Sequence, residues 1–361
     1  MNDEIRIFVP FMSGFGGTET VIKNLFTEYK KEFPSRNNLI LISIGGYEND
    51  EWIKNISNKK VIQLNFNKIF RTLEYLLVLP FLLFKEIHNS NTSTVISTNP
   101  VMWMLLYWIK KIFHYDYEVI SWYHYSLKEK PVRSFILKSA DRYLAISTGI
   151  AKQIVSYGVD ASKIKIIFNP VMNTNITVPR SLKKNQLHFL YVGRIMLDGQ
   201  KNLRDLITAL SNFNSNWTLD IYGQGEKSKV QDFIREKGLE NNIFLQGFKA
   251  NLWESLTSID FLFLTSKFEG FPMVLNEAIS VGIPVISYNC ETGPEDIVKD
   301  NNGFLVYGCN EVDLTKTIEK AAKKIKNFTN TQEIKDSISK FYSQHFLTVF
   351  LQAVRNSQSE R

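Results

Sequence analysis

The stretch KFEGFPMVLNEAISVGIPVISYNCETGPEDI, residues 267–297, is the most informative part of this chain. An apolar run, Phe-Leu-Phe-Leu at 261–264, precedes it, and Pro-Val-Ile-Ser at 284–287 lies within it. Both runs have the composition of buried strands, so the segment between them is predicted to form a loop and then a helix. Glu269 falls in that loop and Glu277 on the first turns of the helix. Because ligands of an open parallel sheet bind at the carboxyl ends of its strands, we expect both carboxylates beside a ligand.

The start of this predicted helix is suited to a phosphate group. A helix N-terminus offers free N–H groups and the positive end of the helix dipole. The residues that lead into it are Gly270, Phe271, Pro272, Met273 and Val274. Carboxylates on either side of a phosphate can accept hydrogen bonds from hydroxyl-rich groups. This layout predicts a nucleotide-sugar ligand, with ribose, diphosphate and sugar in that order.

The same segment resembles the E-x7-E signature of retaining glycosyltransferases of family 4, which have the two-domain fold called GT-B. The flanking sequences Glu-Gly-Phe-Pro, Glu-Ala and Gly-Ile-Pro-Val fit this family as well. The resemblance implies that Glu277 binds the ribose of the donor and that Glu269 contacts the donor sugar. It implies a UDP-sugar as donor substrate and no cofactor. The simpler interpretation is that both carboxylates are solvated and stabilise the helix dipole.

The domain organisation follows from length and from the order of the predicted elements. A chain of 361 residues is too long for one ordinary core and suits two domains. Apolar strand patterns alternate with helical ones in both halves, which predicts an α/β fold with two Rossmann-like, doubly wound domains. In GT-B proteins these domains face each other across a cleft, and the C-terminal helix crosses back to the first domain. We therefore expect an acceptor-binding domain at 1–172, a nucleotide-sugar-binding domain at 186–340 and a returning helix at 341–361. The polar stretch 172–185 is predicted to be the linker, and residues 357–361 are predicted to fray.

Further donor-binding residues are predicted in the second half. Gly193 and Arg194 end its first strand, and Lys201 follows at the start of a helix. Two cations at this place can stabilise the negative charge of a diphosphate leaving group. They resemble the diphosphate-binding pair of the family, although each could be an ordinary surface cation. Gly223 and Phe248 follow later strands, in loops that line the nucleotide in the family.

Two candidates lie in the first half. Gly16 and Gly17 follow its first strand, where adjacent glycines let the backbone approach a ligand closely, and Thr18 is predicted to cap the next helix. The family uses a similar turn to reach the donor phosphate and sugar. His124 follows another predicted strand and resembles a family histidine that faces the donor sugar. The plainer interpretations are a common turn and a structural histidine.

Charge is distributed unevenly along the chain. Residues 1–180 contain 22 Lys and Arg against 15 Asp and Glu, whereas residues 181–361 contain 21 of each. A basic half suits an anionic partner, and we expect an anionic membrane surface or a phosphorylated glycan. Ordinary surface charge is the alternative. The known signatures of nucleic-acid-binding proteins are absent from the sequence, so no nucleic-acid partner is expected.

The remaining patterns bear on location and metals. Cys290 and Cys309 have no disulfide or metal spacing, and no Asp-x-Asp motif occurs, so we expect no metal. The acidic N-terminus leads into a strand, and the longest apolar run, at 75–84, is too short for a bilayer. We therefore expect a cytoplasmic protein, peripheral at the inner face of the membrane.

Together these patterns predict a retaining, metal-independent hexosyltransferase. Trp122-Tyr123-His124-Tyr125-Ser126-Leu127 and other segments are similar to bacterial family members that build surface polysaccharide. Galactose is therefore the expected hexose, ahead of glucose and N-acetylglucosamine, and the acceptor is a cell-surface glycan, glycolipid or glycoprotein. Residues 50–115 show little resemblance, and the acceptor would be recognised there. The alternatives are a non-catalytic GT-B partner subunit of a glycosyltransferase complex and a GT-B sugar-nucleotide epimerase.

Overall fold

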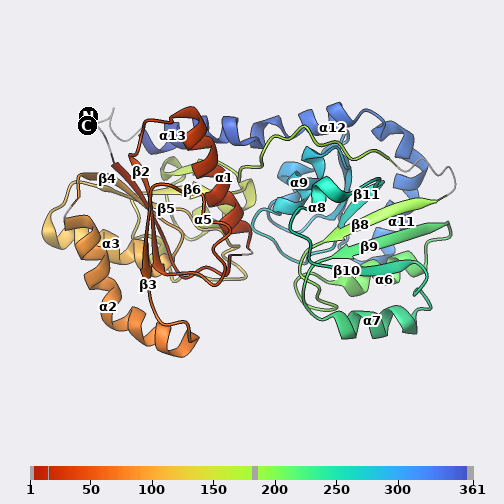
Figure 1. Ribbon diagram of the computed structural model, residues 1–361, viewed down its shortest axis with the longest axis horizontal. Coiled ribbons are helices and arrows are strands. Elements are labelled where there is room, and N and C mark those ends of the chain that lie inside the picture. The colour runs from red at the N-terminus through yellow and green to blue at the C-terminus, as the bar shows by residue number, and fades with distance from the viewer. Residues whose placement is uncertain (1–3, 15, 89, 181–185, 356–361) are drawn as a thin grey trace. The chain divides into compact units, whose positions relative to one another are not determined.

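A computed structural model describes residues 4–14, 16–88, 90–180 and 186–355 (Figure 1). The chain divides into two compact units, one formed by Met1–Pro170 with Ser343–Arg361 and the other by Val171–Tyr342. Each unit is a parallel sheet with helices on its faces, so the predicted fold class is confirmed. Among the described helices, none combines the length and the apolar composition that crossing a membrane requires.

The first unit contains seven parallel strands in the order β3-β2-β1-β4-β5-β6-β7. Their bounds are Glu4–Val9 (β1), Leu39–Gly45 (β2), Lys59–Gln63 (β3), Thr92–Ser97 (β4), Glu118–Ser121 (β5), Arg142–Ala145 (β6) and Ile164–Ile166 (β7). The central strands read as apolar runs because both faces of a parallel sheet are covered by helices. The chain leaves β1 and β4 in opposite directions, which makes their shared border the switch point of this sheet.

Six α-helices cover this sheet. They are α1 (Gly17–Glu32), α2 (Lys68–His88), α3 (Pro100–Phe113), α4 (Ser134–Leu137), α5 (Thr148–Ser156) and α13 (Ser343–Arg355), with a 3-10 turn η1 at Ala161–Lys163. Helix α1 packs against α13, and α2 packs against α3 (Figure 1). Pro100 opens α3, and the side chain of Asn99 caps it by accepting hydrogen bonds from two backbone N–H groups.

The last helix is fastened to the first unit by Arg142 on β6. Its guanidinium pairs with Glu118 on the neighbouring strand β5 and also donates to the carbonyls of Ala353 and Val354 at the end of α13. Glu118 is buried, and among the described residues Arg142 is the cation that pairs with it. One side chain therefore joins two strands of the sheet to a helix that is about two hundred residues away in sequence.

Replacing Arg142 tests whether this side chain attaches α13 to the first unit. Arg142→Ala should lower the free energy of unfolding by about 3 kcal/mol, because it strands a buried carboxylate and two helix-end carbonyls. Arg235→Ala is the matched control: Arg235 pairs with Asp232 on an exposed helix surface, so about 1 kcal/mol or less is expected. Denaturant unfolding measures both, and equal losses in the two variants would contradict the anchoring role.

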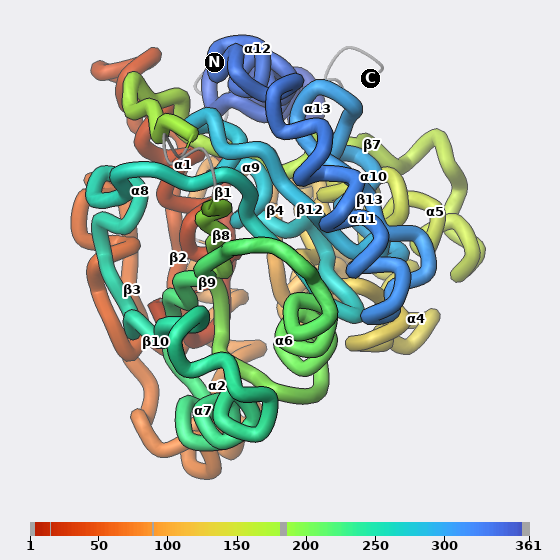
Figure 2. The backbone as a smooth tube through the Cα atoms, turned by 90° about the vertical axis from the view of Figure 1, so that its right-hand side faces the viewer, coloured from red at the N-terminus to blue at the C-terminus, as the bar shows by residue number. Residues whose placement is uncertain are grey.

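The second unit contains six parallel strands in the order β10-β9-β8-β11-β12-β13. Their bounds are Leu187–Val192 (β8), Trp217–Tyr222 (β9), Ile243–Gly247 (β10), Phe261–Leu264 (β11), Val285–Tyr288 (β12) and Gly303–Val306 (β13). The helices are α6 (Leu203–Ser211), α7 (Lys227–Glu236), α8 (Leu252–Ser255), α9 (Met273–Ser280), α10 (Pro294–Ile297), α11 (Glu311–Lys324) and α12 (Thr331–Asp336), with 3-10 turns η2 (Ile325–Phe328) and η3 (Ser339–Phe341). Helix α6 packs with α7 and α11, and α9 packs with α10 and α12; Figure 2 shows α6 and α9 on either side of β8.

The described part of the expected linker is held on this second unit. Val178 is fully buried and donates its N–H to Val281. The guanidinium of Arg180 donates to three backbone carbonyls, those of Ile259, Phe328 and Gly282. The ammonium of Lys335 donates to the carbonyl of Ile176 at 2.6 Å. Residues 172–180 are therefore packed structure, whereas residues 181–185 of the expected linker and the C-terminal 357–361 lie outside the described residues.

Candidate functional site

The switch point of the second sheet lies between β8 and β11. These strands are neighbours, and the chain leaves them in opposite directions, toward β9 and toward β12. In open α/β sheets the loops at such a point diverge and leave a crevice for ligands. Here the two loops are residues 193–202 and 265–272, and they contain the predicted residues Arg194, Lys201 and Glu269.

An ion pair joins the two loops. The ammonium of Lys201 lies 2.5 Å from a carboxylate oxygen of Glu269, and both side chains are largely buried. The backbone fixes their approach, because the hydroxyl of Thr265 donates to the carbonyl of Lys201 at 3.1 Å. The N–H of Lys267 donates to the carbonyl of Gln200 at 2.8 Å. The two predicted residues are thus brought together by the fold, 68 positions apart in sequence.

Arg194 lies on the same loop, directly after β8. Its side chain is exposed, and its carbonyl accepts a hydrogen bond of 3.0 Å from the hydroxyl of Tyr191. Burial raises the pKa of the Tyr191 phenol well above its usual range, and the nearby charge of Glu269 raises it further. Tyr191 therefore stays neutral, and its hydroxyl holds the backbone of Arg194 at the end of β8. An exposed arginine beside a buried ion pair is available to an incoming anion.

Glycines allow the strand-end loops to approach each other closely. Gly223, after β9, has a φ of 151°, and a Cβ at this position would lie 1.8 Å from the carbonyl oxygen of Gly193. Its N–H donates to the carbonyl of Gly247, so the ends of β8, β9 and β10 are held side by side. Phe248 follows directly and is exposed. The predicted nucleotide-lining residues therefore share one edge of the sheet.

The predicted helix after Glu269 is α9, which begins at Met273. Among the described residues, no side chain caps its N-terminus, where Pro272 precedes the first turn, and no acidic residue lies in that turn. The N–H of Leu275 donates to the carbonyl of Pro272, and the N–H groups of the helix before it are thus available to an anion. The side chain of Phe271 is buried against Phe341, with ring centroids 5.3 Å apart, and Met273 is buried too. These two residues can offer a ligand only their backbone, whereas Val274 is partly exposed.

Glu277 lies within α9 and is partly exposed. Burial raises the pKa of its carboxyl to about 7, although a hydrogen bond from the side chain of Trp253 opposes that rise. Trp253 lies on the short helix α8, and no local pattern in the sequence marks it as a partner of Glu277. A carboxyl group that titrates near neutral pH can both accept and donate hydrogen bonds, which suits the hydroxyl groups of a ribose.

The raised pKa of Glu277 makes stability depend on pH. A raised carboxyl pKa means that the folded protein holds a proton that the unfolded chain has lost, so stability falls as pH rises from 4.5 to about 7. The full shift corresponds to about 3 kcal/mol. Glu277→Gln should remove this decline, whereas Glu254→Gln on the exposed surface of α8 should keep it. Unfolding measured at both ends of this pH range tests the shift, and identical pH profiles for wild type and Glu277→Gln would contradict it.

The turn before α10 supports the loop that carries Glu269. The hydroxyl of Thr292 donates to the carbonyl of Glu269. Gly293 has a φ of 98°, and a Cβ there would lie 2.5 Å from Cδ of Pro272. No pattern in the sequence indicated Thr292. Both residues position the start of α9 and the carboxylate loop together.

In the first unit, the glycine turn is organised by Glu19. This buried carboxylate accepts the N–H of Gly14 at 3.0 Å, and a Cβ on Gly16 would lie 2.4 Å from its other oxygen. The prediction that Thr18 caps the helix is wrong: α1 begins at Gly17, so Gly16 holds the cap position, and no side chain of the described residues caps it. The first N–H groups of α1 are therefore uncapped, as those of α9 are.

His124 is buried just past β5, against the ring of Trp122 at 4.8 Å between centroids. Its Nε2 has no hydrogen-bond partner among the described residues. Burial lowers the pKa of the imidazole to about 3, so the ring is neutral at physiological pH. A neutral ring can exchange hydrogen bonds with a ligand, but it supplies no positive charge. In the described part of the chain, no group of three or more His, Cys, Asp or Glu side chains could hold a metal ion.

Comparison with known proteins identifies the family. Residues 15–172 match the family model "Glycosyltransferase Family 4", and residues 173–335 match "Glycosyl transferases group 1". The lipopolysaccharide 1,6-galactosyltransferase of Escherichia coli K12 is 35% identical over 307 residues, 81% of this chain and 82% of that protein. The protein of the same name from Salmonella typhimurium is 33% identical over 308 residues, with the same coverage. The chain therefore belongs to glycosyltransferase family 4, which confirms the resemblance, and it is a glycosyltransferase.

Solved structures agree with this assignment. The apo form of the lipopolysaccharide outer core galactosyltransferase WaaB has a TM-score of 0.83 and 30% identity, covering 98% of this chain and 99% of that one. The Anabaena protein HepE, solved in complex with UDP, has a TM-score of 0.79 at 17% identity, covering 97% of this chain and 99% of that one. At 17% identity, the similarity to HepE shows the fold alone.

Proposed function

We propose that this glycosyltransferase moves a hexose from a UDP-sugar to a lipopolysaccharide or related cell-surface glycan, with retention and without a metal ion. The observation that carries the proposal is the group of charges at the switch point of the second sheet. Arg194, Lys201 and the uncapped start of α9 all present positive charge at the carboxyl edge of that sheet. This is the charge that a diphosphate leaving group needs.

Each predicted residue receives a role within this site. Glu277 binds the ribose hydroxyls, and the loops at Gly223 and Phe248 line the uracil. The ion pair between Lys201 and Glu269 is exchanged for new contacts when the donor binds. When the diphosphate arrives, it competes for the ammonium of Lys201, and the released carboxylate of Glu269 becomes free to accept hydrogen bonds from the sugar hydroxyls. Gly16, Gly17 and His124 of the first unit keep the donor-contacting roles that the family implies.

Retention fits a front-face reaction. The bond between the anomeric carbon and the diphosphate oxygen breaks, and a bond from the same carbon to the acceptor oxygen forms on the same face. The proton of the acceptor hydroxyl passes to the departing phosphate oxygen. Arg194 and Lys201 stabilise the charge that develops there, so a separate general base is unnecessary.

The relatives and the charge distribution support the choice of substrates. Two relatives above 30% identity are named lipopolysaccharide 1,6-galactosyltransferases, which makes UDP-galactose the first donor, ahead of UDP-glucose and UDP-N-acetylglucosamine. The basic excess of residues 1–180 suits a phosphorylated glycan and a peripheral position on an anionic membrane facing the cytoplasm. The alternative, a non-catalytic partner subunit, would not need an intact set of donor residues.

A donor and product assay tests the proposal. Each UDP-hexose is first screened for its effect on thermal unfolding, because a bound donor raises stability by mass action. Release of UDP is then measured with lipopolysaccharide that lacks its outer-core sugars, and the anomeric configuration of the product is read by NMR. Transfer with retention is the expected result. Donor binding without UDP release would favour the partner subunit, and an epimerised nucleotide sugar would favour the epimerase.

Glu269→Ala distinguishes sugar positioning from nucleotide binding. Turnover should fall by about a hundredfold or more, because the variant loses a group that acts on the sugar. UDP affinity should be unchanged or slightly higher, since Lys201 is then free to meet the diphosphate. Steady-state kinetics and calorimetric titration with UDP measure the two effects.

Lys201→Ala is the matched variant for the other half of the ion pair. It should weaken UDP binding, because one of the two cations at the diphosphate is lost. If Glu269→Ala and Lys201→Ala changed UDP affinity and turnover in the same proportion, the separate roles assigned to the two residues would be wrong.

A further inference from the structure

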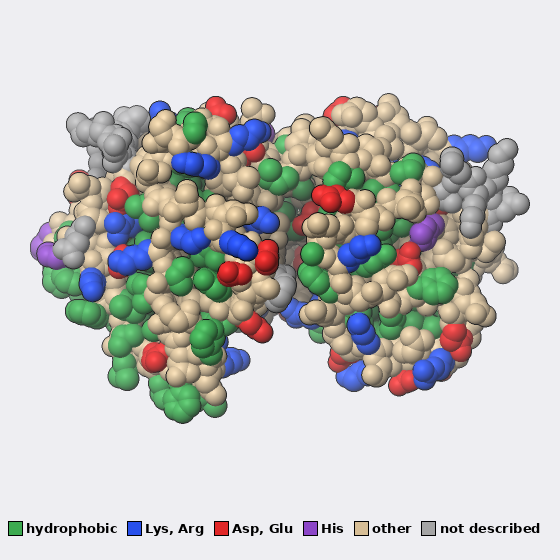
Figure 3. All heavy atoms as spheres, in the orientation of Figure 1, with side chains coloured by type: hydrophobic (Ala, Val, Ile, Leu, Met, Phe, Trp, Pro, Cys, Tyr) green, Lys and Arg blue, Asp and Glu red, His purple; other side chains and the backbone are tan. Residues whose placement is uncertain are grey.

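The first unit carries an unusual apolar surface on helix α2. Exposed side chains recur along its length at helical spacing, and Leu76 and Leu77 are 73% and 81% exposed. The set comprises Phe66, Ile69, Phe70, Leu73, Leu76, Leu77, Val78 and Phe81. Figure 3 shows hydrophobic side chains gathered at the lower end of this unit, where Figure 1 places α2. A surface helix normally turns such a stripe toward the core.

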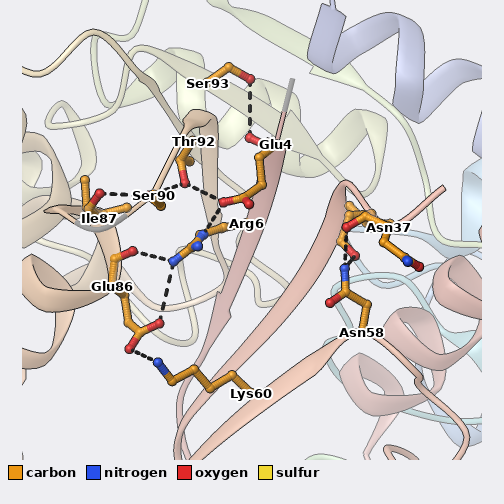
Figure 4. A network of polar contacts seen from close by, with 11 residues as sticks. Glu4, Arg6, Asn37, Asn58, Lys60, Glu86, Ile87, Ser90, Thr92 and Ser93 are labelled. Atoms are coloured by element: carbon orange, nitrogen blue, oxygen red, sulfur yellow. Dashed lines mark hydrogen bonds and ion pairs between the residues drawn. The ribbon is translucent and has the colours of Figure 1, made fainter. Parts of the chain in front are cut away.

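The C-terminal part of α2 is fixed to the sheet, so its apolar side cannot turn inward. Leu79, Leu83 and Ile87 are buried. Glu86 is buried as well and accepts a hydrogen bond from Lys60 at 2.6 Å, while the guanidinium of Arg6 on β1 donates to its backbone carbonyl (Figure 4). The helix therefore presents its apolar face to solvent as part of the folded structure.

Helix α3 extends this surface. Trp108, Ile112 and Phe113 are at least half exposed, and the ring of Phe113 packs on that of Phe84 in α2 with 4.7 Å between centroids. We refer to the exposed apolar residues of 66–81 and 108–113 as the α2–α3 surface. Contiguous exposed apolar patches on this scale mark interaction sites.

The charges around the α2–α3 surface are mainly positive. Residues 66–113 contain five cations, Lys68, Arg71, Lys85, Lys110 and Lys111, against two acids, Glu74 and Glu86. Glu86 is buried, which leaves Glu74 as the acid at the surface. Lys68, Lys85 and Lys111 are exposed. Apolar side chains flanked by lysines are the pattern of a helix that lies in the interface of an anionic bilayer.

A second copy of the chain is a poorer occupant. A symmetric dimer through this surface would bring two mainly positive faces together, and like charges repel. An anionic lipid surface, in contrast, offers both a negatively charged headgroup layer and an apolar interior. Charge complementarity therefore favours an anionic lipid surface over a second copy of the chain.

We propose that the α2–α3 surface docks the protein onto an anionic membrane, with Leu76, Leu77 and Trp108 inserted at the headgroup boundary and Lys68, Lys85 and Lys111 contacting anionic headgroups. The inference rests on the membrane location that is part of the proposed function, and it names the residues responsible. It does not depend on which sugar is transferred.

Binding to vesicles tests the proposal. Full-length protein is sedimented with vesicles of phosphatidylcholine alone or of phosphatidylcholine with phosphatidylglycerol. We expect binding that requires phosphatidylglycerol and weakens as salt is added. Leu76→Ser with Leu77→Ser should weaken it by about tenfold or more. Replacing Lys68, Lys85 and Lys111 by Gln should weaken it by about a hundredfold.

Matched controls change equally exposed residues elsewhere. Phe135→Ser with Val312→Ser controls for lost apolar surface, and a triple Lys→Gln variant at Lys249, Lys323 and Lys326 controls for net charge. Both should bind vesicles like the wild type. Absence of vesicle binding by the wild type, or equal losses in the controls, would overturn the proposal.

Two further measurements separate the alternatives. If sedimentation velocity showed a dimer that Leu76→Ser with Leu77→Ser dissolves, a second copy would be the occupant and the lipid proposal would be wrong. Calorimetric UDP binding by the same variants should equal that of the wild type, because none of the changed residues belongs to the donor site. Loss of vesicle binding with intact UDP binding supports the docking surface alone, whereas failure of UDP binding in the wild type would count against the proposed reaction alone.

Discussion

The contact between the two loops at the switch point of the second sheet is the constraint on which the site depends. The order of the strands sends the chain in opposite directions after β8 and β11, and the backbone bonds of Thr265 and Lys267 then draw the diverging loops together. Lys201 and Glu269 meet only because of that arrangement. A pair of opposite charges in such a place is largely withdrawn from water, and each side chain holds the other in position until an anion competes for the cation.

Electrostatic roles are divided between the groups around this edge. Arg194 and Lys201 supply cationic side chains, the start of α9 contributes a partial positive charge, and burial holds Tyr191 neutral. Glu277 belongs neither to the charged nor to the neutral groups, because its carboxyl titrates near neutral pH. The site thus concentrates its positive charge where a diphosphate would lie, while the surrounding groups offer hydrogen bonds.

Sequence patterns predicted the fold well because both sheets are parallel and covered on both faces, so many of their central strands are short and largely apolar. Strand β11 matches its predicted bounds, and Glu269 and Glu277 lie in the predicted loop and helix. Contacts between distant segments could not be predicted in this way. The side chain of Trp253 on α8 forms a hydrogen bond with Glu277. Arg180 holds residues 172–180 against the second unit, although their polar composition had suggested a linker. Thr18 was misplaced as a cap because Gly16 takes that position.

The attachment of α13 to the first unit has a consequence for synthesis. Trp122 is fully buried, and the rings of Phe346 and Phe350 lie 6.4 and 5.7 Å from it, so residues made after the second unit cover residues made before it. During translation the second unit, which is continuous in sequence from Val171 to Tyr342, emerges whole while the first still lacks a helix. The first unit thus remains incomplete until α13 has been synthesised. A chain that stops before this helix would expose the ring of Trp122, and with it an aromatic surface of the first unit, to solvent.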